Sequence, residues 1–213
     1  MNAGIRIIVA VMDLCFVMAW IGRAGATEDP KLDRIYAEIT RQAHTIETIV
    51  SDFEQERRLG LLDSVASSRG RFFFKKDDRM RWEFTEPNVS GFAVNGDRGK
   101  RWDAATNREE RFGLRQMPFI KVFTDQVFAW ARADFEGLQR AYRVEVVGEH
   151  PADLKLVPLL AQMKEHVNHM RIVFTEDSRH VALIEITESD GDFTRIRFFN
   201  TQTNQALPDD LFD

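Results

Sequence analysis

The chain has 213 residues, of which 44% are hydrophobic and 30% are charged, and its formal net charge is −5. This balance is typical of one soluble globular domain with a sizeable core and argues against a disordered or fibrous protein. The chain is net acidic and has no long basic run, so we expect no nucleic-acid partner, because nucleic acids are bound largely through neutralised phosphates.

The first residues have the pattern of a secretory signal peptide. Arg6 precedes an apolar run over residues 7–21, and Ala24-Gly25-Ala26 offers the small residues that signal peptidase accepts. The run is shorter than the roughly 20 apolar residues of a membrane-spanning helix, so we expect cleavage after Ala26 rather than an uncleaved anchor. Cleavage would remove the only cysteine, Cys15, and leave one domain over residues 27–213 without a thiol for a disulfide or a metal site.

A helix is the first element expected in that domain. Between Leu32 and Val50, apolar residues recur every three or four positions, which predicts an amphipathic helix of about five turns that lies on an apolar surface. A strand should begin at Phe53, and the small polar residues 64–68 predict a loop.

Residues 70–84, GRFFFKKDDRMRWEF, predict a β-hairpin. Apolar and polar side chains alternate on both sides of the polar turn Lys76-Asp77-Asp78, as a half-buried antiparallel pair requires. One face of the hairpin is therefore apolar and aromatic. Its residues are Phe72, Phe74, Met80, Trp82 and Phe84.

Short alternating segments joined by turns fill most of the remaining sequence, and Asn95-Gly96 is a strong hairpin turn among them. The expected strands cover residues 91–95, 101–103, 110–116, 142–146, 154–156, 172–174, 182–186 and 196–198. A very apolar helix is expected from Pro118 through Phe135, ended by Gly137, and a short one within residues 158–167.

The count is about ten strands in one mostly antiparallel sheet, and a sheet of that size tends to curl or close. We therefore predict an α+β domain in which helices pack into the concave side of a curled sheet around one apolar interior. The seventeen phenylalanines and four tryptophans would fill this interior or line a cavity for an apolar ligand, and composition does not separate the two.

Residues with the chemistry of catalysis are nearly absent. There is no nucleophile elbow, phosphate-binding glycine loop or dinucleotide fingerprint. His166 and His169, with Glu165 beside them, could offer metal ligands, but no third ligand accompanies them to complete a tetrahedral zinc site. We expect no enzymatic activity, no metal and no cofactor.

Several short motifs occur in an order that resembles the LolA family of periplasmic outer-membrane lipoprotein carriers. They follow the leading amphipathic helix and run over nearly the whole mature chain. The motifs are Asp52-Phe53-Glu54-Gln55, Gly70-Arg71-Phe72-Phe73-Phe74-Lys75-Lys76, Met80-Arg81-Trp82-Glu83-Phe84 with Pro87, Asn95-Gly96 with Trp102, and Leu207-Pro208-Asp209-Asp210-Leu211-Phe212.

The resemblance implies an incompletely closed antiparallel barrel, with lid helices over a hydrophobic cavity. In that family the cavity holds acyl chains of a lipoprotein, received from an inner-membrane ABC transporter and delivered to an outer-membrane receptor. It implies a location in the periplasm of a Gram-negative bacterium, and we expect a monomer. The expected cavity wall is Phe72, Phe74, Met80, Trp82, Phe84, Phe92, Ile172, Phe174, Ile184, Ile186, Ile196 and Phe198. The expected lid residues are Leu32, Ile35, Ile39, Ile46, Phe119, Ile120, Phe123, Val127 and Trp130.

One position departs from the family. The arginine that latches the family's lid, which precedes a proline, corresponds to Lys76, which precedes Asp77. Lysine is a point charge rather than a fork of donors, so Lys76 is a candidate for a different latch. The sequence therefore leaves two kinds of carrier as alternatives: a general lipoprotein carrier, and a carrier dedicated to one glycolipid or other lipid. A lipid-sensing regulatory module on the same fold and, third, an enzyme acting on lipid are the alternatives from other classes.

Overall fold

The structure is a computed structural model that describes residues 29–60, 64–131 and 134–213. The predicted signal peptide lies outside the described residues. Within them, eleven strands form one sheet in the order β6-β5-β4-β3-β2-β1-β11-β10-β9-β8-β7. Neighbouring strands pair antiparallel throughout. Because β1 pairs with both β2 and β11, the first and last strands meet in the middle of the sheet.

The strands are β1 (Thr48–Leu59), β2 (Ser64–Lys75), β3 (Arg79–Glu86), β4 (Ser90–Asn95), β5 (Arg98–Asp103), β6 (Arg108–Gly113), β7 (Tyr142–Gly148), β8 (Asp153–Pro158), β9 (Val167–Phe174), β10 (Val181–Glu188) and β11 (Phe193–Thr203). The helices are α2 (Pro30–Ala43), α3 (Pro118–Ala131), α4 (Phe135–Ala141) and α5 (Ala161–Lys164), with 3-10 turns η2 (Leu114–Gln116) and η3 (Asp209–Phe212). No described helix is long and apolar enough to cross a membrane.

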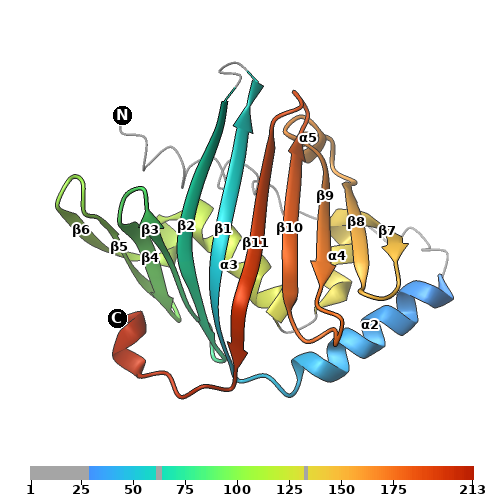
Figure 1. Ribbon diagram of the computed structural model, residues 1–213, viewed down its shortest axis with the longest axis horizontal. Helices are drawn as coiled ribbons and strands as arrows, with labels where there is room; N and C mark the ends of the chain where they lie inside the picture. Colours follow the sequence, from blue (N-terminus) through green and yellow to red (C-terminus); the bar gives the residue numbers. More distant parts are fainter. Residues whose placement is uncertain (1–28, 61–63, 132–133) are drawn as a thin grey trace.

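The helices lie against one face of the open sheet, which we call the inner face. Figure 1 shows α3 and α4 behind the strands and α2 along the end where β9 turns into β10. The ring of Phe128 on α3 lies 6.1 Å from that of Phe74 on β2. This arrangement confirms the predicted fold class, an incompletely closed antiparallel barrel with covering helices.

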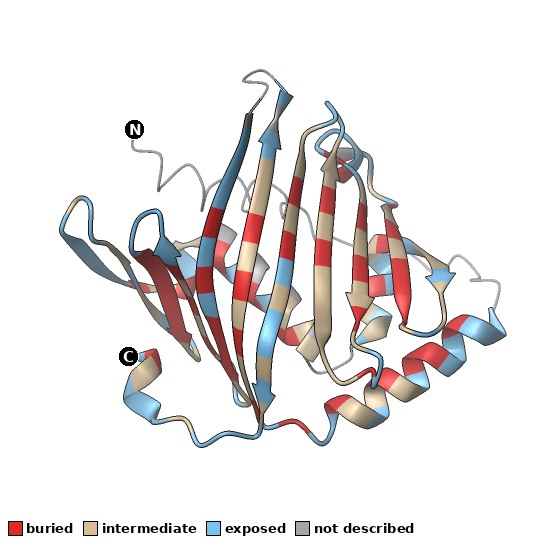
Figure 2. Ribbon diagram, in the orientation of Figure 1, coloured by how far each residue is buried: buried red, intermediate tan, exposed pale blue. Residues whose placement is uncertain are grey.

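Alternation along each strand separates the two faces of the sheet. On β3, Met80, Trp82 and Phe84 are buried while their neighbours are half-buried, and Figure 2 shows buried bands repeating on most strands. The inward side chains join residues of α2, α3 and α4 in one apolar cluster. The sheet therefore buries one face and leaves the other to charged side chains.

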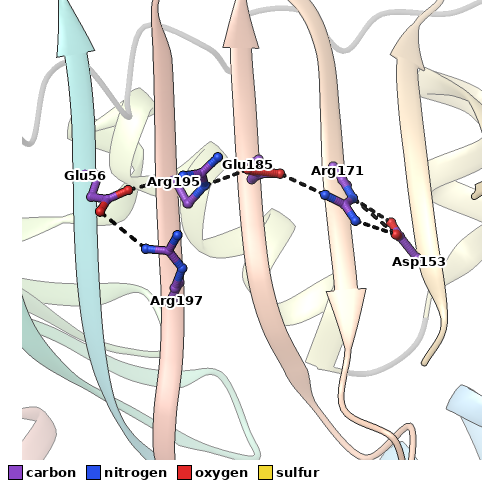
Figure 3. Close-up of polar contacts among 6 residues, drawn as sticks. All are labelled: Glu56, Asp153, Arg171, Glu185, Arg195 and Arg197. Carbon is purple, nitrogen blue, oxygen red and sulfur yellow. Dashed lines mark hydrogen bonds and ion pairs between the residues drawn. The ribbon is translucent and has the colours of Figure 1, made fainter. Parts of the chain in front are cut away.

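The outer face carries a line of alternating charges that crosses five strands (Figure 3). Arg171 contacts Asp153 at 2.7 Å and Glu185 at 3.2 Å, linking β8, β9 and β10. Arg195 continues the line from Glu185 at 2.6 Å to Glu56 at 3.4 Å, and Arg197 also contacts Glu56, at 3.4 Å. The hydrogen bond to Asp153, with the charges of Asp153 and Glu185 beside it, raises the pKa of Arg171 above its ordinary value. Opposite charges on neighbouring strands favour this register over one shifted by a residue.

The C-terminal segment covers the outer face at the other half of the sheet. The 3-10 turn η3 packs against β3 and β4, and Phe212 is only 1% exposed. Lys75 donates to the Asp209 carboxylate at 2.6 Å, and Arg81 donates to the Leu211 carbonyl at 3.3 Å. The outward-pointing Phe73 is thereby buried although it faces away from the helices.

The long first helix of the sequence prediction is wrong at its end. Helix α2 stops at Ala43, and Ile49 and Val50 belong to β1. Their β-branched side chains suit a strand, and pairing with both β2 and β11 offers this segment more hydrogen bonds than another turn of helix would. The predicted loop at residues 64–68 is also wrong, because these residues extend β2 opposite β1.

The second predicted helix is divided into two. Helix α3 ends at Ala131, and α4 begins after Asp134, whose side chain caps it by accepting from the Gly137 N–H at 3.2 Å. Gly137 therefore lies inside the first turn of α4 and does not end a helix. The short helix expected within residues 158–167 is present as α5.

The predicted hairpin at residues 70–84 is confirmed. Phe72 faces Trp82 and Phe74 faces Met80 across β2 and β3. Asp77 and Asp78 adopt positive φ angles of 67° and 58° in the turn. Such a turn matches the twist of two antiparallel strands, and aspartate tolerates this conformation.

Gly70 makes room for an aromatic ring at the centre of the sheet. It lies between Phe53 on β1 and Phe84 on β3 in the strand register. A Cβ at this position would come within 2.1 Å of the Glu83 carbonyl oxygen and 2.4 Å of Phe53 Cζ. The hydrogen of glycine therefore allows the fully buried Phe53 ring to lie flat against the sheet.

Gly70→Ala should destabilise the fold, because both close neighbours are fixed by the sheet. We expect a loss of about 1–3 kcal/mol in the free energy of unfolding, the usual cost of overpacking, measured by urea denaturation. Gly113→Ala is the matched control, since its Cβ would meet nothing closer than 3.8 Å. Equal stability of the two variants would contradict the role given to Gly70.

Candidate binding cavity

An apolar cavity of about 120 Å³ lies between the inner face of the sheet and the helices. Its walls come from α2, α3 and seven strands, so it spans both halves of the sheet. The lining residues are Ile39, Ala43, Ile46, Ile49, Ser51, Phe72, Trp82, Val127, Ala131, Tyr142, Met170, Phe174, Arg179, His180, Val181, Ile184, Ile186, Ile196, Phe198 and Thr201. The cavity is smaller than the about 300–1,000 Å³ of typical small-molecule sites.

Aromatic rings form one wall of this cavity. Trp82 lies 5.6 Å from Phe72 and 6.1 Å from Phe198, measured between ring centroids, with the rings edge to face. Behind them, the buried Phe53 ring lies 4.6 Å from Trp82 and 5.4 Å from Phe84. Rings at these distances add attraction beyond the burial of their area, so this wall is a rigid part of the cavity.

The structure places all twelve residues predicted for the cavity wall in the apolar interior. Seven of them line the cavity, namely Phe72, Trp82, Phe174, Ile184, Ile186, Ile196 and Phe198. The other five, Phe74, Met80, Phe84, Phe92 and Ile172, are buried in the core around it. The alternation of each strand thus indicated which face is apolar, while the position along the strand decides which residues reach the cavity.

The predicted lid residues divide in the same way. Ile39, Ile46 and Val127 line the cavity, although Ile46 lies in the connection between α2 and β1 rather than in a helix. Leu32, Ile35 and Ile120 are buried in the core. The side chains of Phe119, Phe123 and Trp130 lie outside the described part of the structure.

Helix α2 packs on the interior through its buried face of Leu32, Ile35, Tyr36, Ile39 and Ala43, and polar contacts at both ends add to this packing. At its C-terminus, Lys76 Nζ donates to the His44 carbonyl at 3.2 Å and to Glu47 at 2.6 Å. A cation is favourable there because the carbonyls at a helix C-terminus carry partial negative charge. Near the N-terminus, Glu149 pairs with Lys31 at 3.0 Å.

A ring stack joins α2 to α4. The rings of Tyr36 and Phe135 lie parallel, 3.9 Å apart between centroids. Burial raises the pKa of Tyr36 to about 12, so its hydroxyl is protonated at neutral pH. The two helices are therefore coupled to each other by an apolar contact, whereas α2 is coupled to the sheet partly by exposed ion pairs, which are weak in water.

The sequence did not point to the polar residues of the cavity. Ser51 and Thr201 join β1 to β11, with their hydroxyl oxygens 2.7 Å apart. Arg179 and His180 come from the turn between β9 and β10. Burial lowers the pKa of His180 below its ordinary value of 6.5. A turn residue has no periodicity to reveal its direction, so only the structure shows that these two side chains reach the interior.

One cluster of carboxylates in the described residues has the residue types of a metal site. Glu188, Asp190 and Asp192 gather at the turn between β10 and β11. Asp192 accepts from the Gly60 N–H at 2.6 Å, and Asp190 accepts from the Asp192 N–H at 3.0 Å. These carboxylates thus order the turn itself. The histidine pair considered from the sequence is not part of this group.

Solved structures with the same fold include MucB. The chain aligns with MucB at a TM-score of 0.54 and 14% identity, covering 89% of this chain and 64% of MucB. In the complex of MucA and MucB from Pseudomonas aeruginosa, the TM-score is 0.51 with 14% identity, over 86% of this chain and 59% of the other. The chain thus spans less than two thirds of these structures, and at this identity the likeness shows the fold.

Sequence comparison gives the family. The outer-membrane lipoprotein carrier protein of Francisella tularensis subsp. novicida (strain U112) is 23% identical over 209 residues, covering 94% of this chain and 90% of that protein. The family model described as outer membrane lipoprotein carrier protein LolA matches residues 44–213. That range contains the whole sheet, the aromatic wall and helices α3 and α4. The chain therefore belongs to the LolA family of outer membrane lipoprotein carrier proteins.

Proposed function

We propose that this protein is a periplasmic carrier that binds acyl chains of lipoproteins, or of a related lipid, in its apolar cavity and shuttles them from the inner to the outer membrane. Family membership supports lipoprotein or lipid carriage. The observation that carries the proposal is the cavity itself, an apolar space closed on one side by separate helices rather than by a second sheet. Binding and release, not catalysis, is the activity that such a site can perform.

The small volume of the cavity is consistent with a carrier in its closed, unloaded form. Burying an acyl chain gains about 0.8 kcal/mol per methylene, so a chain of about sixteen carbons would gain roughly 12 kcal/mol, equivalent to nanomolar dissociation. A carrier that gained all of this would not release its cargo. If the lid helices must first leave the apolar sheet, cargo contacts replace lid contacts and the net gain becomes smaller.

Helix α2 is the best candidate for the moving part of the lid. Its contacts through Lys76 and Glu149 are exposed and exchange readily with water. In this proposal Lys76 is the latch, because it joins the turn between β2 and β3 to the C-terminal carbonyls of the helix. It replaces the arginine that the family uses, with fewer donors in a looser geometry.

The proposal also includes two partner proteins for this transport. An inner-membrane ABC-type exporter would load the protein, and an outer-membrane receptor would accept the cargo. A lipid-sensing regulatory module is the alternative, since MucB shares the fold and was crystallised with MucA. That likeness concerns the fold alone, so the carrier is the better supported function.

Native mass spectrometry of the protein purified from the periplasm of a Gram-negative host tests the proposal. We expect a mature chain that begins at Thr27, with a fraction carrying an added acylated ligand. Binding of a fluorescent fatty acid to the delipidated protein should accompany this. Absence of any acylated species, together with no binding of the fluorescent fatty acid, would overturn the carrier function.

Filling the cavity should raise the stability of the fold and weaken ligand binding. Ala43 on α2 lines the cavity and is 8% exposed. Ala43→Leu should raise the free energy of unfolding by about 0.5–2 kcal/mol, as cavity-filling changes do, and should weaken binding of the fluorescent fatty acid. Ala37→Leu, the same change on the exposed side of the helix, is the control. Unchanged fatty-acid affinity in Ala43→Leu would argue that the ligand does not enter this space.

Removing the latch should loosen helix α2. Lys76→Gln loses the charge that contacts His44 and Glu47, so the amides of α2 should exchange with deuterium faster and a bound fatty acid should dissociate faster. Lys155→Gln, which removes an exposed ion pair from the outer face, should change neither rate. Identical exchange in α2 of the two variants would exclude Lys76 as a latch.

A further inference from the structure

The polar residues of the cavity gather at one end of it. Ser51 lies near the start of β1, Thr201 near the end of β11, and Arg179 and His180 immediately before β10. In Figure 1 these parts of the strands meet at the lower edge of the sheet, beside the C-terminal end of α2. The rings of Phe72, Trp82 and Phe198 adjoin this end, since Phe72 pairs directly with Ser51 across β1 and β2, and they form an apolar wall. The cavity therefore has a polar end and an apolar interior, like an amphiphile.

Arg179 is the unusual member of this polar end. Its Nε is buried and has no hydrogen-bond partner among the described residues. None of those residues forms an ion pair with it either. The nearby carboxylate of Asp177 accepts instead from the Thr175 hydroxyl at 2.6 Å and from the Arg179 backbone N–H at 3.2 Å. Asp177 thus fixes the turn, and it acts on the guanidinium through its nearby charge rather than through a hydrogen bond or a close ion pair.

A buried guanidinium Nε without an acceptor is costly, because a buried donor normally finds an acceptor. The turn that presents it is well ordered. Ser178 takes a positive φ of 56° and is 6% exposed, and the Ser178 N–H donates to the Thr175 carbonyl at 2.8 Å. The backbone of this turn thus presents the Arg179 side chain at the cavity that it lines. Such a donor fits an acceptor that arrives with a ligand.

His180 adds a second, uncharged polar group. Its Nδ1 lies 3.5 Å from the Val181 carbonyl oxygen, and burial favours the neutral imidazole. The remaining groups here, Ser51 and Thr201, satisfy each other. Arg179 thus contributes the full charge at this end of the cavity. Planar guanidinium binds carboxylate and phosphate oxygens in preference to neutral esters or alcohols.

We infer that this end of the cavity is a head-group site for a single-chain anionic lipid, whose carboxylate or phosphate accepts a hydrogen bond from Arg179 while its acyl chain lies against Trp82 and Phe198. The inference rests on the proposed carrier function and narrows its cargo. The neutral ester and amide groups of a lipoprotein's acyl chains would not neutralise the charge of Arg179, whereas the carboxylate of a fatty acid or the phosphate of an alkyl phosphate would. The small volume of the closed cavity also favours one chain over several.

Three ligands with the same twelve-carbon chain separate the head group from the chain. Laurate, dodecyl phosphate and dodecanol would be titrated calorimetrically into the delipidated full-length mature protein, below their micelle concentrations. We expect laurate, dodecyl phosphate or both to bind at least about tenfold more tightly than dodecanol, the usual worth of a charged hydrogen bond. Which anion binds better distinguishes a carboxylate from a phosphate cargo.

Arg179→Gln should reduce this preference to about twofold or less and leave dodecanol affinity unchanged, whereas Arg179→Lys should retain part of it. Arg98→Gln, which neutralises an exposed arginine on β5, is the control and should retain the full preference. Should Arg179→Gln fail to fold, added salt would serve instead, since it should weaken laurate binding to the unaltered protein and not dodecanol binding.

The outcomes separate the two proposals. Equal affinity of the unaltered protein for all three ligands, or an equal loss for all three in Arg179→Gln, would overturn the head-group site and leave the carrier intact. If none of the three ligands bound the unaltered protein, the cavity would not hold acyl chains and the carrier function itself would fail.

Discussion

An antiparallel sheet with one apolar and one charged face must keep water from the apolar side, and the remaining structure follows from that requirement. The outer charges, from Asp153 across to Arg197, favour a single register. In that register the inward residues of every strand meet the helices. Helices joined only by short connections cover a curled sheet less completely than a second sheet would. The space that they leave uncovered is the cavity.

The same requirement bears on the proposed carrier function, in which one molecule holds and releases an apolar cargo. Phe53, Trp82 and Phe84 pack into one aromatic wall, with ring centroids 4.6 Å and 5.4 Å from that of Phe53. The covering helices differ, because α2 contacts the sheet partly through exposed ion pairs and stacks on α4 through Tyr36. In the proposed carrier, an aromatic wall beneath a cover of separate helices would let cargo contacts replace helix contacts, which would keep the affinity within a reversible range.

The sequence was sufficient to predict which face of the sheet each side chain lies on. It was insufficient to predict which buried side chains reach the cavity and where the helices end. Period-two alternation placed Phe72, Trp82 and Ile184 correctly on the inner face, because side-chain direction in a strand is fixed by parity. The same pattern could not separate Met80, buried in the core, from Trp82 beside the cavity. The end of α2 was missed because Ile49 fits both a helix period and a strand, and only its pairing with β2 and β11 decides between them.

The polar end of the cavity and the end of helix α2 are the same region of the molecule. Ala43 and Ile46, on either side of the carbonyl that Lys76 contacts, line the cavity together with Arg179. In the proposed carrier, a lipid whose head group sits at Arg179 would therefore lie directly beneath the latched end of the lid. Opening there would admit water to the head group first and weaken its hydrogen bond, since a charged pair loses strength as the dielectric rises. Release could then begin at the charged end while the apolar wall still holds the chain, so that the cargo would leave in one direction.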